Sequence, residues 1–507
     1  MTARAAPVRP TGFDPRWLPL AVTTVGSFMS VLDTSIVNIA LPSILKDFGA
    51  SIEEGQLVIT SYLMALAVVI PASGFLAERV GMKRLYIITL ISFTVGSALC
   101  GMAWNVQSLT FFRVLQGLGG GMIQPLGMAI VFTLITPLER PYFMGLLGIP
   151  VLLGPVLGPS LGGYLTEYAS WRAIFLINVP IGLIDLGLAI WLLKETPIRH
   201  TAKLDTRGFV LSAITFPSLV LALSWGAQHG WGSPLVLALL AVGLVGLTLF
   251  VRHELGHRKP MLQLRLFSDP MFRLAVAVQW IGFFSLFGLN YLLPLFLEFA
   301  HGWSAAKTGM ALLPMGIVAF VTMNLAGRAY NRVGPKVLSV AGLGVLLATT
   351  FLWGFVDERT PLYAVMILVG GRGLALGLFS QTVQMVAYNT VPEGQMPRAT
   401  ALVNTGQRIN GAIATAIVTT VLVFSLRWHG APEGTSITSG TAPLSFMLRS
   451  FRDAFWLMTG LSTVGLTLSF FLHDRVLVEW RERAARGEVS HGRGEVRSEP
   501  QAGPAAR

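Results

Sequence analysis

Among the charged residues that lie inside long apolar stretches, where charge is costly, two could act together. Asp33 falls within the apolar run 17–41, and Arg113 falls within the run 107–133. A carboxylate in a membrane-spanning segment is unfavourable, so it normally faces a cavity or a charged partner. Burial favours the neutral form of such an acid, and a nearby arginine favours its ionised form. Asp33 and Arg113 therefore predict a site that handles protons or cationic ligands.

The positions of the two residues within their runs allow them to pair. At about 1.5 Å per helical residue, Asp33 and Arg113 are expected at similar depths, about 12 Å and about 9 Å from the outer surface. A pair at that depth could exchange a proton when the protein changes conformation. The alternative is a static ion pair that holds the two spans together, and the sequence leaves both interpretations open.

Other polar residues of the apolar runs are weaker candidates for chemistry. Asp185 is expected toward the inner end of the run 172–193, and Glu298 at the outer end of the run 274–299. Uncharged polar side chains could line a central cavity, although each is as readily explained by a hydrogen bond between helices. The cavity candidates are Tyr62, Gln124, Asn290, Gln381, Gln384 and Asn404.

A ten-residue phrase occurs twice, each time between apolar runs. It reads GFLAERVGMK at Gly74–Lys83 and GRAYNRVGPK at Gly327–Lys336. Such a repeat indicates two related halves, as in transporters that rock one half against the other. The charges of the first copy predict a latch at the cytoplasmic rim, unless they serve only to fix the topology. The residues concerned are Gly74, Glu78, Arg79, Gly81 and Lys83.

The apolar run 143–166 is unusually rich in glycine and proline. Glycines four residues apart share one helical face and permit close approach of a neighbouring helix. Prolines weaken the helical hydrogen-bond ladder and allow bending. These features predict an interface along which the halves slide or rock, and the alternative is a tightly packed static crossing. The residues concerned are Gly154, Pro155, Gly158, Pro159, Gly162 and Gly163.

The composition is that of a membrane protein. Hydrophobic residues make up 53% of the 507 residues and charged residues 12%, against roughly 25% charged residues in soluble domains. Apolar runs of about 20 residues, the length that spans a bilayer, recur along the chain. Fourteen spans are expected, at 17–41, 57–77, 85–104, 107–133, 143–166, 172–193, 208–227, 234–251, 274–299, 308–327, 337–356, 362–388, 401–426 and 454–472.

The expected fold is an all-α integral membrane protein with two six-helix bundles and two inserted transmembrane helices. With both termini in the cytoplasm, most of the 37 Lys and Arg residues fall in cytoplasmic segments, as the positive-inside rule requires. The expected location is therefore the inner (cytoplasmic) membrane, with the lipid bilayer as surroundings. The segments are a cytoplasmic tail 1–16, a bundle 17–193, linkers with the inserted helices 194–273, a second bundle 274–472, and a disordered cytoplasmic tail 473–507.

Several classes of function find no support in the sequence. The distribution of the +12 net charge follows the membrane topology, so no nucleic-acid partner is expected. No glycine-rich loop of the Walker type is present, which argues against ATP-driven pumping. No His/Cys cluster with metal-ligand spacing and no nucleophile–base pair are identified, so neither a metal, nor a cofactor, nor enzymatic activity is expected.

These motifs resemble those of the major facilitator superfamily. Gly74–Lys83 resembles its loop signature between the second and third spans, and Arg113–Gly119 (RVLQGLG) resembles its fourth-span motif. Gly154–Gly163 (GPVLGPSLGG) resembles the fifth-span signature associated with antiporters. Together with fourteen spans, the stretch Leu32–Pro42 resembles the fourteen-helix drug:proton antiporter family of the EmrB/QacA type.

The resemblance implies a major facilitator fold and a secondary active multidrug exporter. Inward proton movement would drive efflux of amphipathic, often cationic small molecules by alternating access, from a site between the halves. Asp33 would exchange protons, Arg113 would tune it, and Glu298, where the family often has Gln, would add a second site. Some relatives work with a periplasmic adaptor protein, so that partner stays open. The alternatives are an exporter of a lipid, siderophore or metabolite, and a non-transporting membrane receptor or scaffold.

Overall fold

The computed structural model describes residues 17–136, 139–195, 205–257, 260–392, 394–432, 443–474, 477–479, 482 and 486. The expected tail 1–16 and most of the expected tail 473–507 lie outside these residues. The described chain is helical: α1 Trp17–Phe48, α2 Ile52–Val80, α3 Met82–Gly101, α4 Val106–Leu134, α5 Arg140–Tyr168, α6 Ala173–Leu176, α7 Asn178–Leu192, α8 Thr206–His229, α9 Pro234–Gly256, η1 Leu264–Ser268, α10 Pro270–Leu295, η2 Phe296–Ala300, α11 Ala305–Val333, α12 Pro335–Trp353, α13 Leu362–Asn389, α14 Met396–Trp428 and α15 Leu444–Ser469.

Twelve helices within the described residues are long and apolar enough to cross a membrane, with α6–α7 and α10–η2 each forming one span. An all-α, multi-pass membrane protein is therefore confirmed, but the count of fourteen spans is not. The expected spans 143–166 and 454–472 correspond to α5 and α15, which are not among the twelve. Side chains along much of α5 lie outside the described residues, and the apolar part of α15 begins only after Asp453.

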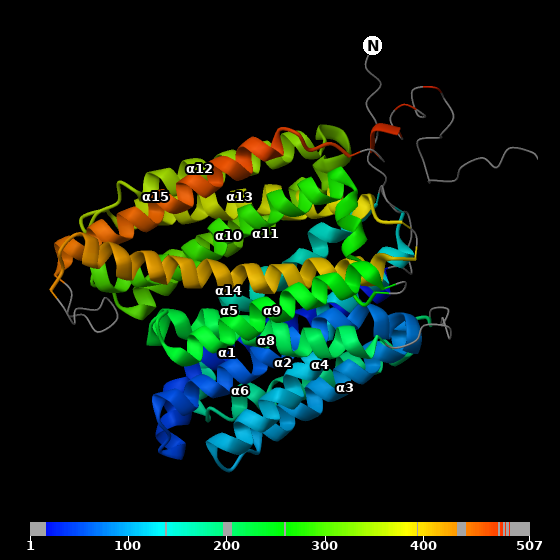
Figure 1. Ribbon diagram of the computed structural model, residues 1–507, viewed down its shortest axis with the longest axis horizontal. Helices are drawn as coiled ribbons and strands as arrows, with labels where there is room; N and C mark the ends of the chain where they lie inside the picture. The colour runs from blue at the N-terminus through cyan, green and yellow to red at the C-terminus, as the bar shows by residue number, and fades with distance from the viewer. Residues whose placement is uncertain are drawn as a thin grey trace, which may run out of the picture.

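The helices form two groups with a pair between them (Figure 1). The early helices α1–α4 and α6 lie in the lower part of the view, and α10–α13 and α15 lie in the upper part. Contacts between helices join the groups, because α5 packs on α11, and α14 packs on α2 and α4. The pair α8–α9 lies at this junction, where α8 contacts both α2 and α14.

The two copies of the repeated phrase form the same turn. Gly81 separates α2 from α3 with a φ of +94°, and Gly334 separates α11 from α12 with a φ of +96°. Only glycine adopts this backbone region at little cost, which explains its presence at the same offset in both copies. The shared turn supports the interpretation of the phrase as an internal repeat.

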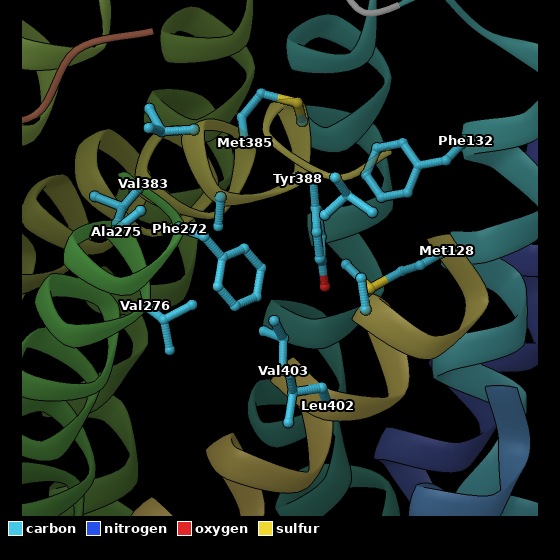
Figure 2. Packing of buried hydrophobic residues seen from close by; sticks show 14 of the residues in the cluster. Met128, Phe132, Phe272, Ala275, Val276, Val383, Met385, Tyr388, Leu402 and Val403 are labelled. Carbon is cyan, nitrogen blue, oxygen red and sulfur yellow. The ribbon is translucent and has the colours of Figure 1, made fainter. Parts of the chain in front are cut away.

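A single hydrophobic cluster joins the two groups at one end of the bundle. Met128 and Phe132 of α4 point toward Tyr388 of α13, where the ring centroids of Phe132 and Tyr388 are 5.0 Å apart (Figure 2). Leu402 and Val403 of α14 belong to the same cluster. At the opposite end the described core residues form separate clusters, one from α1–α6 and one from α10–α15. The two groups are therefore tightly packed together at one end only.

Candidate proton and substrate site

Asp33 of α1 is fully buried and is enclosed by three hydrogen-bond donors. Its Oδ2 accepts a bond from Arg113 Nη1 at 2.7 Å. Its Oδ1 accepts from Gln116 Nε2 at 2.8 Å and from Asn178 Nδ2 at 3.0 Å. A buried carboxylate stays ionised only when it is paired and hydrogen-bonded. The structure therefore brings Asp33 and Arg113 together in an arrangement that suits the ionised acid.

The guanidinium of Arg113 is held on several sides. Nη1 also donates to Gln116 Oε1 at 2.8 Å, and Nε donates to Val58 O at 3.4 Å. The guanidinium carbon lies 3.9 Å from the ring centroid of Tyr62, a cation–π geometry. Tyr62, predicted to line a cavity, is buried in this position beneath Arg113. Its packing fixes the orientation of the arginine toward Asp33.

Ser97 of α3 completes the polar network and was not predicted from the sequence. Its Oγ accepts bonds from Gln116 Nε2 at 3.0 Å and from Asn178 Nδ2 at 3.1 Å, and donates to Phe175 O at 2.9 Å. Gln116 and Asn178 were also missed as site residues. Gln116 carried a signal, since residues three apart share a helical face and it follows Arg113 by three. Ser97 and Asn178 come from other helices, and only the fold brings them near.

The two weaker acids lie apart from this network. Asp185 is buried in α7, where Oδ2 accepts a bond from Tyr86 Oη at 3.3 Å and Oδ1 has no hydrogen-bond partner among the described residues. It follows Asn178 by seven residues, which corresponds to about 10 Å along the helix. Glu298 is half-buried in the π-helical turn η2 and takes part in no ion pair among the described residues.

A second buried arginine has a neutral partner. Arg372 of α13 donates from Nη2 to Asn290 Oδ1 at 3.0 Å and to Leu286 O at 3.2 Å. Its Nε and Nη1 have no hydrogen-bond partner among the described residues, although the side chain is fully buried. Asn290, predicted as a cavity residue, is exposed. Within the described part of the chain, no carboxylate balances the charge of Arg372.

The remaining cavity candidates are less informative. Gln384 donates to Tyr388 Oη at 3.2 Å and Asn404 donates to Thr400 O at 2.8 Å, each within its own helix. Gln124 and Gln381 are half-buried. One helical turn after Asn404, the half-buried Arg408 of α14 lies close enough to Tyr62 for the two groups to interact electrostatically. The sequence prediction did not name Arg408 as a site residue.

Glu78 joins the two helix groups at their closed end. Its Oε2 lies 2.6 Å from Arg398 Nη2, and both side chains are nearly buried. Arg398 Nη1 also donates to Pro260 O at 3.0 Å. At Gly74 a β-carbon would lie 2.6 Å from Pro397 O, so only glycine allows α2 and α14 to approach this closely. The charged contact predicted for the repeated phrase thus has a specific partner, at the start of α14.

The other charges of the phrase make local contacts. Lys83 Nζ donates to Ile190 O at 2.7 Å, at the end of α7. Arg79 is exposed and takes part in no ion pair among the described residues. Of the charged side chains named in this phrase, Glu78 is therefore the one whose ion pair crosses between the helix groups.

The glycines of α5 face α1 in this conformation. Gly154 packs on Val31, Gly158 on Ser35 and Gly162 on Ile36, and Ser35 Oγ donates to Gly154 O at 2.9 Å. A β-carbon added at Gly163 would meet no neighbouring atom within 4 Å. The side chains of Pro155 and Pro159 lie outside the described residues. The glycine face therefore forms a close crossing between neighbouring helices of one group, while other residues of α5 contact α11.

One further cluster was missed from the sequence. Ligand atoms of Asp205, His253 and His257 all lie within 4.8 Å of one another, so this group could hold a metal ion. The prediction that no histidine cluster has metal-ligand spacing is wrong at this point. The signal was the separation of His253 and His257 by four residues, about one helical turn, with His253 in the last turn of α9 and His257 directly after the helix.

Comparison with known proteins decides the family. Residues 23–415 match the description "Major Facilitator Superfamily". The chain belongs to the Major Facilitator Superfamily. It is therefore a secondary transporter and not an enzyme. The fold agrees, because the human organic anion transporter MFSD10 superposes with a TM-score of 0.66 at 16% identity, over 90% of this chain and 100% of that chain.

Bacterial relatives in the superfamily are more similar in sequence. The uncharacterized MFS-type transporter YhcA of Bacillus subtilis (strain 168) is 32% identical over 81% of this chain and 77% of its own length. MdtD of Escherichia coli (strain UTI89 / UPEC), named as a candidate multidrug resistance protein, is 31% identical over 93% of this chain and 98% of its own length. The bacterial relatives suggest the cell membrane as the location.

Proposed function

We propose that this chain is a proton-coupled multidrug exporter that moves amphipathic, often cationic compounds out of the cell. The observation that carries the proposal is the fully buried Asp33, which accepts hydrogen bonds from Arg113, Gln116 and Asn178. An ionisable residue inside a membrane bundle is a functional candidate by default, because it is costly to keep there. The similarity to MdtD supports drug-like cargo.

The proposed topology is that of the fourteen-helix drug:proton antiporters, with α5 and α15 as the two further spans. The proposed bundles are 17–193 and 274–472, and the inserted pair α8–α9 with its linkers occupies 194–273. Both termini face the cytoplasm in this proposal, and the location is the inner membrane. The end at which Glu78 binds Arg398 is then the cytoplasmic end, and the conformation described is closed toward the cytoplasm.

In the proposed cycle, Asp33 binds a proton that enters from outside. Protonation removes the charge that holds Arg113 Nη1 at 2.7 Å, so the network around Asp33 loosens. Reopening toward the cytoplasm separates Glu78 from Arg398, releases the proton inside and admits cargo. Asp185, with one carboxylate oxygen unpaired among the described residues, and Glu298 are proposed as further proton acceptors.

Transport in proteoliposomes tests this proposal. A pH gradient is imposed, a lipophilic cation dye is offered, and the wild type is compared with Asp33→Asn and, as a matched buried acid, Asp185→Asn. Gradient-driven dye movement that Asp33→Asn abolishes and Asp185→Asn only reduces is the expected result. Dye movement that survives in Asp33→Asn but not in Asp185→Asn would reassign the proton site. Gradient-independent movement in the wild type would contradict proton coupling.

A second candidate is an exporter of a metabolite, lipid or siderophore that carries an acidic group. It is favoured by Arg372 and Arg408, which take part in no ion pair among the described residues. Two such arginines inside the bundle favour an anionic ligand over a cationic one. Competition between the cation dye and amphipathic acids separates the two candidate functions. If the wild type transports an amphipathic acid and Arg408→Gln does not, the exporter of acidic compounds is favoured.

A further inference from the structure

Outside the proton site, a cluster of ligating side chains lies where α8 begins and α9 ends. Asp205 is the residue before α8, and its Oδ1 caps the helix by accepting a bond from Gly208 N at 2.9 Å. His253 Nε2 lies 2.7 Å from the same oxygen. The rings of His253 and His257 stack with centroids 5.2 Å apart. Ligand atoms of these two histidines and Asp205 lie within 4.8 Å of one another.

Two buried carboxylate oxygens beside these histidines are unsatisfied. Asp205 is 4% exposed and Glu254 is 0% exposed. Glu254 Oε2 accepts a bond from Leu262 N at 2.9 Å, but Glu254 Oε1 and Asp205 Oδ2 have no hydrogen-bond partner among the described residues. A buried oxygen that carries charge is costly unless it is paired or binds a cation. These two atoms therefore indicate that a cation belongs nearby.

The unsatisfied oxygens converge on one place. A β-carbon on Gly208 would lie 2.5 Å from Asp205 Oδ2 and 2.8 Å from Glu254 Oε1. Because residue 208 is glycine, the first turn of α8 leaves room beside both oxygens. Arg398 acts electrostatically on Glu254, but its guanidinium is engaged by Glu78 and by Pro260 O.

We propose that Asp205, His253 and His257 bind one divalent transition-metal ion of the Zn²⁺ class, with Glu254 as an adjacent carboxylate that balances its charge. Two imidazoles and a carboxylate suit Zn²⁺, whereas Mg²⁺ and Ca²⁺ prefer sites built from oxygen. Zn–N and Zn–O bonds of about 2.0–2.2 Å in tetrahedral geometry place ligand atoms about 3.3 Å apart. The 2.7–4.8 Å separations here reach that geometry by small side-chain movements.

A metal ion at this site would lie close to the ion pair between Arg398 and Glu78 at the closed end of the bundle. Three residues after His257, Pro260 O accepts the hydrogen bond from Arg398 Nη1. A metal ion on His257 would restrain the chain three residues before Pro260, whose carbonyl oxygen binds the arginine that pairs with Glu78. The inserted pair α8–α9 would then brace the closed end of the bundle. This inference concerns metal binding and does not depend on which cargo the protein exports.

Metal binding by the purified full-length protein tests the proposal. The protein in detergent is stripped with a chelator, titrated with Zn²⁺, desalted, and assayed for bound metal. We expect one Zn²⁺ per chain, at least tenfold weaker binding in His257→Gln, and no change in His429→Gln. His429 is a matched control because its Nε2 also faces a carboxylate, Asp453 at 2.9 Å, outside the cluster.

Thermal unfolding provides a second readout that does not need transport. Zn²⁺ should raise the unfolding temperature of the wild type and of His429→Gln, but not of His257→Gln, and Mg²⁺ should have no such effect. His257 follows the last residue of α9 and caps no helix through its side chain, so His257→Gln is expected to fold. Absence of stoichiometric Zn²⁺ in the wild type, or equal binding by His257→Gln, would overturn the proposal.

Discussion

Asn290 accepts a hydrogen bond from Arg372 in the second helix group, just as Asp33 accepts one from Arg113 in the first. Arg372 donates to Asn290 Oδ1 at 3.0 Å, and Arg113 donates to Asp33 Oδ2 at 2.7 Å. In both cases a residue on the first long helix of a group receives an arginine from the fourth helix of that group. Of the two hydrogen-bond acceptors, Asp33 can ionise and Asn290 cannot. The two pairs therefore have a similar arrangement but differ in net charge.

The first prediction concerns the buried pair. Asp33→Asn should lower the free energy of unfolding by about 3–5 kcal/mol, because it leaves the charge of Arg113 buried without a counter-ion. Thermal unfolding in detergent measures this loss. The double variant Asp33→Asn with Arg113→Gln should recover part of it, since it removes the orphaned charge. A double variant less stable than Asp33→Asn would show that Arg113 is held by other contacts.

The second prediction concerns the pair that lacks an acid. Asn290→Asp should raise the free energy of unfolding by about 1 kcal/mol, because a carboxylate would replace an amide oxygen that already lies 3.0 Å from Arg372 Nη2. The gain is modest because Asn290 is exposed. Thermal unfolding at neutral pH measures it, and the gain should disappear at a pH low enough to protonate the new acid. A loss of stability at neutral pH would contradict the geometry.

The third prediction concerns the closed end of the bundle. Glu78→Gln should weaken the contact with Arg398 by about 1.5–3 kcal/mol and so raise the open population roughly tenfold or more. A reporter Met128→Cys, placed in the shared hydrophobic cluster, should then react faster with a maleimide. The native Cys100 is fully buried and should contribute little background.

The control for this measurement is Arg84→Gln. Arg84 pairs with Glu195 at 3.3 Å, but the pair is largely exposed and lies within one helix group. An exposed pair of this kind contributes little. Equal acceleration by Arg84→Gln would mean that charge at this end, and not the contact between Glu78 and Arg398, sets the rate.

The fourth prediction concerns the crossing of α1 and α5. Gly158→Ala should lower the free energy of unfolding by about 1–3 kcal/mol, because the new β-carbon would overlap Ser35 Oγ. Gly163→Ala on the same helix is the control. It meets open space, and alanine favours a helix over glycine, so stability should stay level or rise slightly. If both variants behave alike, the close contact at Ser35 is not what constrains α5.

Much of the fold was accessible from the sequence because membrane helices leave strong local signals. Apolar runs located the helices, and the repeated Gly81 and Gly334 marked equivalent turns. The depth of Asp33 and Arg113 in their runs was enough to anticipate their pairing, since helical rise converts position into depth. The charges of the repeated phrase were expected to form a latch, and Glu78 of that phrase pairs with Arg398 of α14.

The site residues that were not predicted from the sequence come together only through the packing of particular helices against each other. Ser97 and Asn178 carry ordinary polar side chains, and nothing local distinguishes them from interhelical hydrogen-bonding residues elsewhere. The glycines of α5 indicated a close helix contact, but not that α1 would be the partner. His253 and His257 form a ligating group only because Asp205, from the start of the preceding helix, reaches the same point.

The hydrogen bonds of Ser97 have a consequence for how tightly protons are retained. Its hydroxyl accepts from two amides and donates to a backbone carbonyl, so its single proton points away from Asp33. Each hydrogen bond to Asp33 is donated by a side-chain amide or by the guanidinium of Arg113. Amide N–H groups do not relay protons. In this conformation no hydroxyl of the network donates to the carboxylate, so a proton that enters from outside would reach Asp33 by a route other than these hydrogen bonds. In the proton-coupled exporter proposed above, this arrangement would limit proton flow through the network, because an uncoupled proton path would dissipate the gradient that drives export.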